Sequence, residues 1–175
     1  GSIILVDRQK GGPMERPPLS KQFLLETEDK LDPVFLLKRA KWYKGNDIIL
    51  KLGVEALEIN LRTNFLTLSN GDRLTFDKLV LATGARPRFL PGCDNLVNAF
   101  VLRQPDDAIA IRETARKVRS AVIIGGGYIG LEVAASFRQM GLEVCVIEAA
   151  ERLLARVASP PVANSLLNLH QKNGV

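Results

Sequence analysis

Three glycines with the spacing G-x-G-x-x-G are the residues whose types and positions point most directly to chemistry: Gly125, Gly127 and Gly130. They follow the apolar run 122–124, which is typical of a buried parallel strand, and helix-forming residues come directly after them. In such a strand–turn–helix, the first glycine permits the tight turn and the second lets the backbone approach a pyrophosphate. The third lets helix and strand pack closely. This pattern predicts a dinucleotide site.

The residues around the glycines have the arrangement that such a site needs. The pyrophosphate would lie on the free N–H groups at the start of the helix, near Tyr128 and Ile129. The run 129–140 has amphipathic periodicity, and Gly141 follows where a helix end favours glycine. A second apolar strand, 142–147, comes next. We therefore expect a βαβ unit rather than an isolated glycine-rich turn.

An acidic residue, Glu148, ends that second strand about twenty residues beyond the glycines, where a dinucleotide fold uses an acid to bind ribose. Its carboxylate could accept hydrogen bonds from both ribose hydroxyls, and its charge would repel a 2′-phosphate. Arg152 follows shortly afterwards, so NADPH is disfavoured rather than excluded. We expect a preference for NADH.

The bulk composition excludes several other classes of function. The 175 residues are 46% hydrophobic and 25% charged, with a formal net charge of +5 from scattered Lys and Arg. No basic stripe interleaved with aromatics indicates nucleic-acid binding, and no apolar run approaches the roughly 18 residues of a membrane span. The single His170 and the well-separated Cys93 and Cys145 suggest neither a metal site nor a disulfide. The positive excess could help to dock an acidic protein.

The remaining elements must position these groups. Apolar runs and their periodicity predict strands at 3–6, 48–52, 54–61, 65–68, 73–76 and 79–81, and helices at 21–25, 34–41, 106–118 and 159–169. The 3–6 strand ends on Asp7, and Asn70-Gly71 marks a tight turn. Two prolines, Pro17 and Pro18, should prevent regular structure until Ser20 caps the first helix. A proline-containing linker places a domain boundary near residue 92.

Several segments together resemble the FAD- and NAD(P)-dependent pyridine nucleotide–disulfide reductase superfamily. The closest similarity is to its ferredoxin-reductase-type members, of the putidaredoxin reductase and rubredoxin reductase kind, which serve oxygenases and cytochromes P450. The segments that carry the resemblance are Arg-Pro-Pro-Leu-Ser-Lys at 16–21, Leu-Val-Leu-Ala-Thr-Gly-Ala-Arg-Pro at 79–87, the glycine motif at 125–132, and Val-Ile-Glu at 146–148. The cysteine pair of the disulfide reductases is absent from this stretch.

The resemblance implies an α/β, Rossmann-like, glutathione-reductase-type architecture with two domains and a three-layer ββα arrangement, here incomplete. Residues 1–92 would form part of the FAD-binding domain, and 93–175 the first half of the NAD(P)-binding domain. The family's first strand and its own glycine motif would precede Ser2. We therefore expect the sequence to be part of a longer protein, and whether this part alone binds FAD or is active stays open.

The resemblance also implies contacts with the flavin cofactor: Asp7 at the adenosine ribose, Val54 at the adenine, Thr83 and Gly84 beside the pyrophosphate, and Arg103 near the flavin. Lys21 would lie beside the flavin N5, with Glu132 as its ion-pair partner near the nicotinamide. Considered alone, Lys21 would be interpreted as a surface lysine, and only its flanking residues favour a function. Arg16 is a further candidate to contact FAD, although it could simply cover the adjacent prolines.

The expected activity is electron transfer from NADH through FAD to a ferredoxin, a rubredoxin or a similar redox protein. Two alternatives use the same scaffold. One is a monodehydroascorbate-reductase-like or NADH-oxidase-like enzyme, which differs in its electron acceptor. The other is an apoptosis-inducing-factor-like flavoprotein that acts through protein partners. We expect a cytoplasmic protein without nucleic-acid partners, and a homodimer is one expected assembly of the full-length form.

Overall fold

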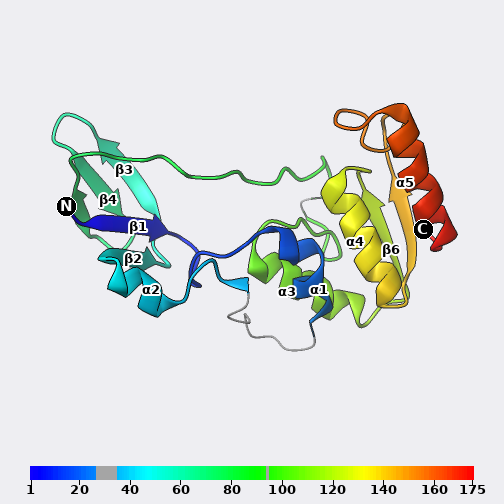
Figure 1. Cartoon of the computed structure of the whole chain (residues 1–175), viewed down its shortest axis with the longest axis horizontal. Coiled ribbons are helices and arrows are strands. Elements are labelled where there is room, and N and C mark those ends of the chain that lie inside the picture. Colours follow the sequence, from blue (N-terminus) through cyan, green and yellow to red (C-terminus); the bar gives the residue numbers. More distant parts are fainter. Residues whose placement is uncertain (27–34, 94) are drawn as a thin grey trace. The chain divides into compact units, whose positions relative to one another are not determined.

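A computed structural model describes residues 1–26, 35–93 and 95–175, which group into two compact units (Figure 1). The first unit contains Gly1–Glu15 and Lys30–Ala85, and the second contains Arg16–Asp29 and Arg86–Val175. These units differ from the expected division at residue 92, because the break falls after Ala85 and an early segment joins the second unit. The assignment of the two expected domains to FAD and NAD(P) stays a prediction.

The first unit contains a parallel pair of strands, β1 (Ile3–Asp7) and β2 (Ile48–Leu52), joined along all five residues of each strand. This pairing confirms the strands predicted at 3–6 and 48–52. A short helix, α2 (Ala40–Gly45), precedes β2 and packs against it. The parallel arrangement places the carboxyl end of β1, and therefore Asp7, beside the carboxyl end of β2.

An antiparallel sheet follows in the same unit, in the order β3 (Ala56–Asn60), β4 (Phe65–Leu68) and β5 (Arg73–Thr75). The strand predicted at 65–68 is confirmed, while those predicted at 54–61 and 73–76 are shorter in the structure. Gly71 has φ +88° in the β4–β5 turn, a conformation that L side chains rarely adopt. The Asn-Gly pair was therefore a correct signal for this turn.

Of the helix predicted at 34–41, only residues 40–41 are confirmed, as the start of α2, and Val34 lies outside the described residues. Residues 35–37 instead pair antiparallel with 13–15: the Glu15 N–H donates to the Phe35 carbonyl, and the Leu37 N–H donates to the Pro13 carbonyl. A bridge joins Met14 and Leu36 between these two bonds. Backbone bonding to a distant segment replaced the helical bonding that local propensity favoured.

The buried strand predicted at 79–81 was also wrong. Residues 79–85 have no regular secondary structure, and Val80 is 84% exposed. An apolar run forms a strand only when a neighbouring strand supplies hydrogen-bond partners. Within the described residues of the first unit, neither of the two sheets includes this segment.

The second unit contains the predicted βαβ unit: β6 (Ser120–Ile124), α4 (Tyr128–Gln139) and β7 (Glu143–Ile147). The two strands are parallel and paired along all five residues of each, and α4 packs on both of them. Gly141 ends the helix with φ +87°, as the sequence predicted. A final helix, α5 (Pro160–Lys172), confirms the predicted helix near the end of the sequence.

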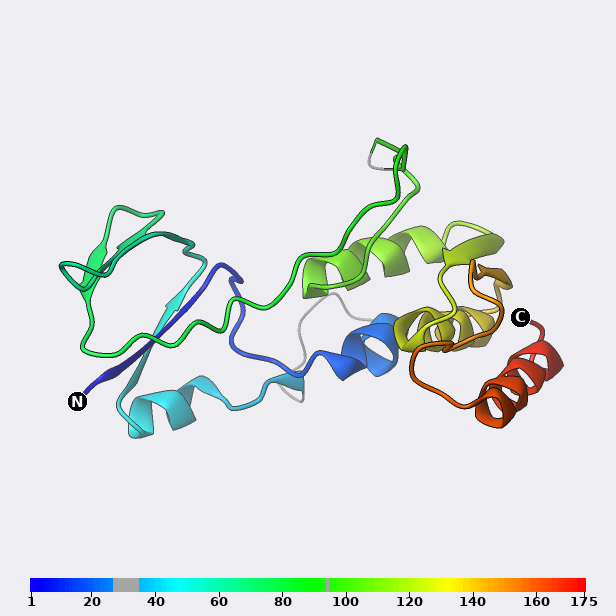
Figure 2. The same ribbon diagram turned by 90° about the horizontal axis from the view of Figure 1, so that it is seen from above.

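Three further elements of this unit pack on one another, and the first of them also contacts α4 (Figure 2). These are a 3₁₀ helix η1 (Pro17–Ser20), α1 (Gln22–Leu25) and α3 (Pro105–Ala115). The prolines were wrongly expected to prevent regular structure: they occupy the first positions of η1, where a helix tolerates proline. Ser20 does not cap α1, because its hydroxyl bonds elsewhere. Among the helices of the described part, none is long and apolar enough to cross a membrane.

Candidate functional site

The three glycines of the motif differ in their steric surroundings. Gly125 has φ +109°, which favours glycine over any L residue. A methyl group at Gly130 would lie far inside van der Waals contact with the carbonyl oxygen of Gly125 and 3.3 Å from a methyl of Ile123. A methyl group at Gly127 would meet nothing within 4 Å. The φ of Gly125 and the close approach at Gly130 agree with the tight turn and the close packing expected of them, and the space beside Gly127 is open.

The motif spacing assigns no role to Gly126, but in the structure its small size keeps it clear of two neighbouring side chains. A Cβ at this position would overlap a methyl of Leu153 and lie 3.2 Å from a carboxylate oxygen of Glu148. The Gly126 carbonyl also accepts a hydrogen bond of 3.0 Å from the Leu154 N–H. The loop after β7 thus closes directly over the glycine turn, a contact that no local spacing could indicate.

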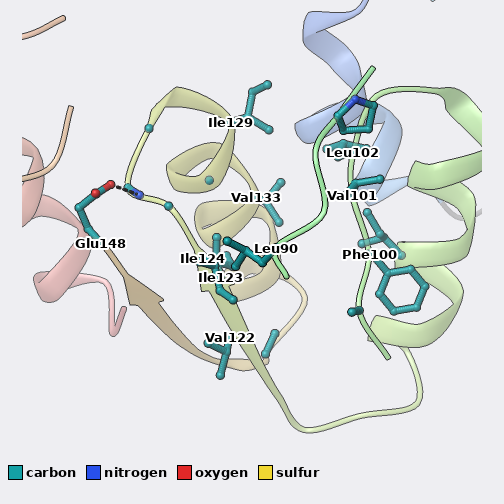
Figure 3. A pocket seen from close by; sticks show the side chains of 18 of the residues that line it. Leu90, Phe100, Val101, Leu102, Val122, Ile123, Ile124, Ile129, Val133 and Glu148 are labelled. Atoms are coloured by element: carbon teal, nitrogen blue, oxygen red, sulfur yellow. Dashed lines mark hydrogen bonds between the residues drawn. The ribbon is translucent and has the colours of Figure 1, made fainter. Parts of the chain in front are cut away.

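Glu148 lies at the end of β7 and binds this same turn. One carboxylate oxygen accepts a hydrogen bond from the Gly126 N–H at 2.7 Å (Figure 3), and the other accepts one from the Ala150 N–H at 2.8 Å. These backbone bonds, from Ala150 first and Gly126 second, hold the pKa of Glu148 below its ordinary value, with a contribution from the positive charge of Arg156. The carboxylate is therefore ionised and oriented before any ligand arrives.

Arg152, which the sequence suggested could admit a 2′-phosphate, is engaged elsewhere. Its guanidinium donates to the carbonyl of Ala158 at 2.7 Å and to the carbonyl of Ala155 at 2.9 Å. These bonds fold the segment between β7 and α5. The guanidinium whose charge acts on Glu148 is instead that of Arg156.

A cavity of about 1490 Å³ lies beside the glycine turn, within the second unit. Apolar side chains from the 87–102 loop, β6 and α4 line it, including Leu90, Phe100, Leu102, Ile124 and Val133 (Figure 3). The first turn of α4, at Tyr128–Gly130, has N–H groups without helical acceptors, as every helix start does. These donors, the open side of Gly127 and the acid at Glu148 fit a dinucleotide at this end of α4.

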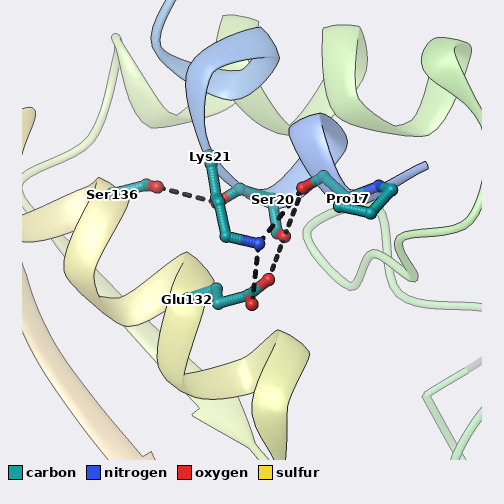
Figure 4. A network of polar contacts seen from close by, with 5 residues as sticks. All are labelled: Pro17, Ser20, Lys21, Glu132 and Ser136. Carbon is teal, nitrogen blue, oxygen red and sulfur yellow. Dashed lines mark hydrogen bonds and ion pairs between the residues drawn. The ribbon is translucent and has the colours of Figure 1, made fainter. Parts of the chain in front are cut away.

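A second polar group forms where η1 and α1 meet α4. The Lys21 ammonium lies 2.7 Å from Oε1 of Glu132, and the Ser20 hydroxyl donates to Oε2 of Glu132 at 2.5 Å (Figure 4). The Ser136 hydroxyl donates to the Ser20 carbonyl at 2.7 Å. The structure thus forms the predicted Lys21–Glu132 ion pair. The sequence predicted neither serine as a member of this polar group, because no local motif links Ser20 or Ser136 to Glu132.

The ionisation of Glu132 reflects two opposing effects. Partial burial works to raise its pKa, but the hydrogen bonds from Lys21 and Ser20, together with the Lys21 charge, outweigh burial and lower it. The side chains of Lys21 and Glu132 are 46% and 31% exposed, so the pair remains accessible from solvent. Glu132 can therefore hold the positive ammonium group of Lys21 in place at a surface that a ligand could reach.

Arginines anchor the segment that carries Lys21. The Arg16 guanidinium donates to the Arg103 carbonyl at 3.0 Å and to the Gln104 side chain at 2.6 Å. The guanidinium of Arg112, which is 1% exposed, donates to the Phe23 carbonyl at 3.2 Å. Arg16 and Arg103, which were predicted as separate cofactor contacts, are therefore joined to each other by a hydrogen bond from the Arg16 guanidinium to the Arg103 carbonyl.

The predicted FAD contacts of the first unit are only partly brought together. The Val54 N–H donates to the Asp7 carbonyl at 3.2 Å. Thr83 and Gly84 lie in the exposed irregular stretch, where Gly84 has φ +69°. In the part of the chain that the structure describes, no hydrogen bond joins either of them to Asp7 or Val54. The same described residues contain no group of three or more His, Cys, Asp or Glu able to hold a metal ion.

Asp7 and Glu148 share one local contact. Each follows or ends a parallel strand, and each accepts a hydrogen bond from the backbone N–H two residues later, from Gln9 at 2.9 Å and from Ala150 at 2.8 Å. An acid held in this way keeps an oxygen oriented at a strand end, where open α/β sheets bind their ligands. The contact of Asp7 with a ribose stays a prediction.

Comparison with known proteins gives one consistent answer. The family model described as pyridine nucleotide-disulphide oxidoreductase matches residues 1–175. The chain is 39% identical to the ferredoxin–NAD(+) reductase component of a 3-phenylpropionate/cinnamic acid dioxygenase from Photorhabdus laumondii, covering 100% of this chain and 44% of that protein.

Two solved structures are similar over the whole chain. The ferredoxin reductase for the CYP199A2 system from Rhodopseudomonas palustris has a TM-score of 0.94 and 34% identity, covering 100% of this chain and 43% of that one. Putidaredoxin reductase, in its covalent complex with putidaredoxin, has a TM-score of 0.91 and 38% identity, covering 100% and 42%. The chain therefore spans less than half the length of these relatives. The FAD/NAD(P)-binding α/β fold class is confirmed, and the chain belongs to the pyridine nucleotide-disulphide oxidoreductase family.

Proposed function

We propose that the protein is a FAD-dependent reductase that takes electrons from NADH and passes them to a ferredoxin, a rubredoxin or a similar redox protein. The observation that carries the proposal is the Lys21–Glu132 ion pair. The pair joins two segments that are more than a hundred residues apart, and Glu132 lies on α4, the helix that begins at the glycine motif. The similarity of the whole chain to ferredoxin reductases supports the same choice.

The NADH site would use the βαβ unit. Gly125 turns the chain, Gly127 leaves room for the pyrophosphate, and Gly130 allows α4 to begin close to β6. The N–H groups of Tyr128 and Ile129 would hold the pyrophosphate oxygens. These groups need no rearrangement, because the turn and the helix start are already formed.

Selection of NADH would depend on Glu148. Its ionised carboxylate would accept hydrogen bonds from the ribose hydroxyls and repel a 2′-phosphate. Arg152 would offer such a phosphate little attraction, because its guanidinium is bound to two backbone carbonyls. Both features support a preference for NADH over NADPH.

The FAD site would use Asp7 at the ribose and Val54 at the adenine, with Thr83 and Gly84 near the pyrophosphate and Arg103 and Arg16 toward the flavin. The backbone-held carboxylate of Asp7 supports this arrangement, because it matches that of Glu148 at the other strand end. The remaining positions follow from the family resemblance.

When bound, the nicotinamide and the flavin supply hydride and electron transfer, while the protein supplies placement and charge. Lys21 would stabilise negative charge that develops beside its ammonium group. Glu132 would keep that ammonium in one position through its 2.7 Å contact. The net charge of +5 favours an acidic redox partner, since opposite charges accelerate encounter.

The test is whether the purified full-length protein is yellow and bleaches when NADH is added without oxygen. Transfer of the electrons to an added ferredoxin or rubredoxin should follow. A colourless protein, or a yellow one that NADH does not bleach, would reject the proposal. Bleaching without reduction of either redox protein would reject only the proposed acceptors.

A pair of lysine variants tests the proposed site. Lys21→Met should slow bleaching by NADH about a hundredfold, because it removes one stabilising donor from the reacting centre. Lys51→Met is the matched control, since Lys51 forms a 2.7 Å pair with Asp72 in the first unit at similar exposure. Equal rates for the two variants would exclude Lys21 from the reaction.

A further inference from the structure

Two buried serines connect the ends of the polar group around Glu132. Ser20 is 4% exposed and Ser136 is 3% exposed, although serine is usually a surface residue. Ser136 lies one helical turn beyond Glu132 on α4, so both side chains lie on the same face of the helix. Figure 4 shows both of them directed at Ser20, one toward its carbonyl and the other toward its hydroxyl.

The position of the Ser20 proton follows from the distances. A hydroxyl has one proton to donate, and two acceptors are available: the Pro17 carbonyl at 3.4 Å and Oε2 of Glu132 at 2.5 Å. A hydroxyl bonded to an ionised carboxylate has a typical O–O distance of about 2.5–2.7 Å. The proton therefore belongs to the bond with Glu132, and that carboxylate is the charged acceptor.

Both oxygens of Glu132 are consequently occupied by donors from one short segment. Ser20 binds Oε2 and Lys21 binds Oε1, so rotation of the carboxylate would break two bonds at once. The Lys21 ammonium also contacts the Pro17 carbonyl at 3.3 Å. Among the described residues, Lys21 is the charged side chain within ion-pair distance of Glu132.

The Ser136 bond fixes the backbone from which these donors extend. Its hydroxyl binds the carbonyl of the peptide group that joins Ser20 to Lys21, and therefore sets the orientation of that peptide. The Lys21 N–H is bonded to the Pro18 carbonyl at 3.0 Å on the other side of the same peptide. Both donors to Glu132 thus start from a constrained backbone.

We propose that Ser20 and Ser136 are positioning residues that hold the Lys21–Glu132 pair in its working geometry. The inference rests on the proposed function, in which this pair lies at the site of hydride transfer. Ser20 orients the carboxylate, and Ser136 orients the peptide that carries both Ser20 and Lys21. Such preorganisation matters because small displacements of a reacting group reduce rates strongly.

The first experiment measures the geometry without using activity. The carboxyl ¹³C signal of Glu132 is titrated by NMR in the full-length protein and in Ser20→Ala, Ser136→Ala and Ser159→Ala. Loss of the Ser20 hydrogen bond should raise the pKa of Glu132, because that bond helps to lower it. Ser136→Ala should raise it less, and Ser159→Ala should not change it, since that exposed side chain caps no N–H of α5.

An unchanged Glu132 titration in Ser20→Ala would overturn the proposal. An unchanged titration in Ser136→Ala alone would overturn the part assigned to Ser136. Ser20→Cys keeps the side-chain volume with a weaker donor, and should also raise the pKa. This second variant decides the question if Ser20→Ala folds poorly.

The second experiment measures flavin bleaching by NADH in a rapid-mixing instrument. Ser20→Ala should lower the limiting rate about tenfold with little change in the NADH concentration for half-maximal rate, and Ser20→Thr should restore much of it. A rate equal to that of wild type would overturn the positioning role. If wild type itself does not bleach, the proposed function fails, while the NMR titration still decides whether Ser20 controls Glu132.

Discussion

A single methyl group added at Gly127 should weaken nucleotide binding without impairing folding, because the space beside this glycine is open. Gly127 precedes α4 with φ −82°, which alanine can adopt, and an added Cβ meets no atom within 4 Å. Alanine is a poorer helix N-cap than glycine, at a cost below about 1 kcal/mol. Gly127→Ala should therefore fold almost as well as wild type.

The same methyl group would occupy the space through which the proposed pyrophosphate approaches the start of α4. Moving the phosphate oxygens away weakens a charge-assisted hydrogen bond to the helix N–H groups, worth about 2 kcal/mol. That loss corresponds to roughly a thirtyfold higher Kd for NADH. The prediction is thus a large loss of affinity with a small loss of stability.

Gly130→Ala is the matched control, because it makes the same chemical change one turn away. Its Cβ would overlap the backbone carbonyl of Gly125, so relief requires movement of the turn itself. Overpacking against a backbone atom should cost about 3 kcal/mol of unfolding free energy. Gly130→Ala should therefore lose stability first, and any loss of binding should accompany it.

Urea unfolding and a fluorescence titration with NADH distinguish the two variants. The expected pattern is a nearly unchanged urea midpoint with weak binding for Gly127→Ala, and a clearly lowered midpoint for Gly130→Ala. Wild-type affinity in Gly127→Ala would refute the placement of the pyrophosphate. Wild-type stability in Gly130→Ala would refute the steric argument.

Three further predictions follow from the polar contacts. Glu148→Ala should narrow the difference between the Michaelis constants for NADH and NADPH, because the repulsive carboxylate is lost while Arg156 remains; an unchanged ratio would show that Glu148 does not contact the ribose. The pKa of Glu132 is lowered in the folded state, so its pair contributes stability above its unfolded pKa and loses it as the pH falls through the folded one. Between about pH 5 and about pH 3, the free energy of unfolding in urea should therefore fall more steeply for wild type than for Glu132→Gln. Parallel plots of this free energy against pH would contradict the prediction. Arg112→Met should cost about 2 kcal/mol, because it removes a charged donor from the buried carbonyl of Phe23. An unchanged urea midpoint would exclude that role.

The sequence correctly predicted the elements whose signals are local. The run into Gly125, the helix ending before Gly141 and the strand ending at Glu148 all follow from periodicity and glycine placement over about thirty residues. The structure confirms these three elements and their parallel strand pairing. Local chemistry was sufficient here because each residue's partner lies within the same supersecondary unit.

Local signals failed where the partner is distant in the sequence. Residues 35–37 have helical propensity but pair with 13–15, and the apolar run 79–81 lacks a neighbouring strand among the described residues. Helix and strand propensities describe the secondary structure that a segment favours in isolation. They contain no information on which other segment of the backbone will offer it competing hydrogen bonds.

The sequence by itself determined a βαβ unit with an acid at its end, together with a family resemblance that named Lys21 and Glu132. Only the tertiary structure decided that Ser20 binds Glu132 and that Ser136 holds the Ser20 carbonyl. These bonds join residues 112 and 116 positions apart. Their formation depends on the packing of η1 on α4, and the spacing of residues along a chain does not record such packing.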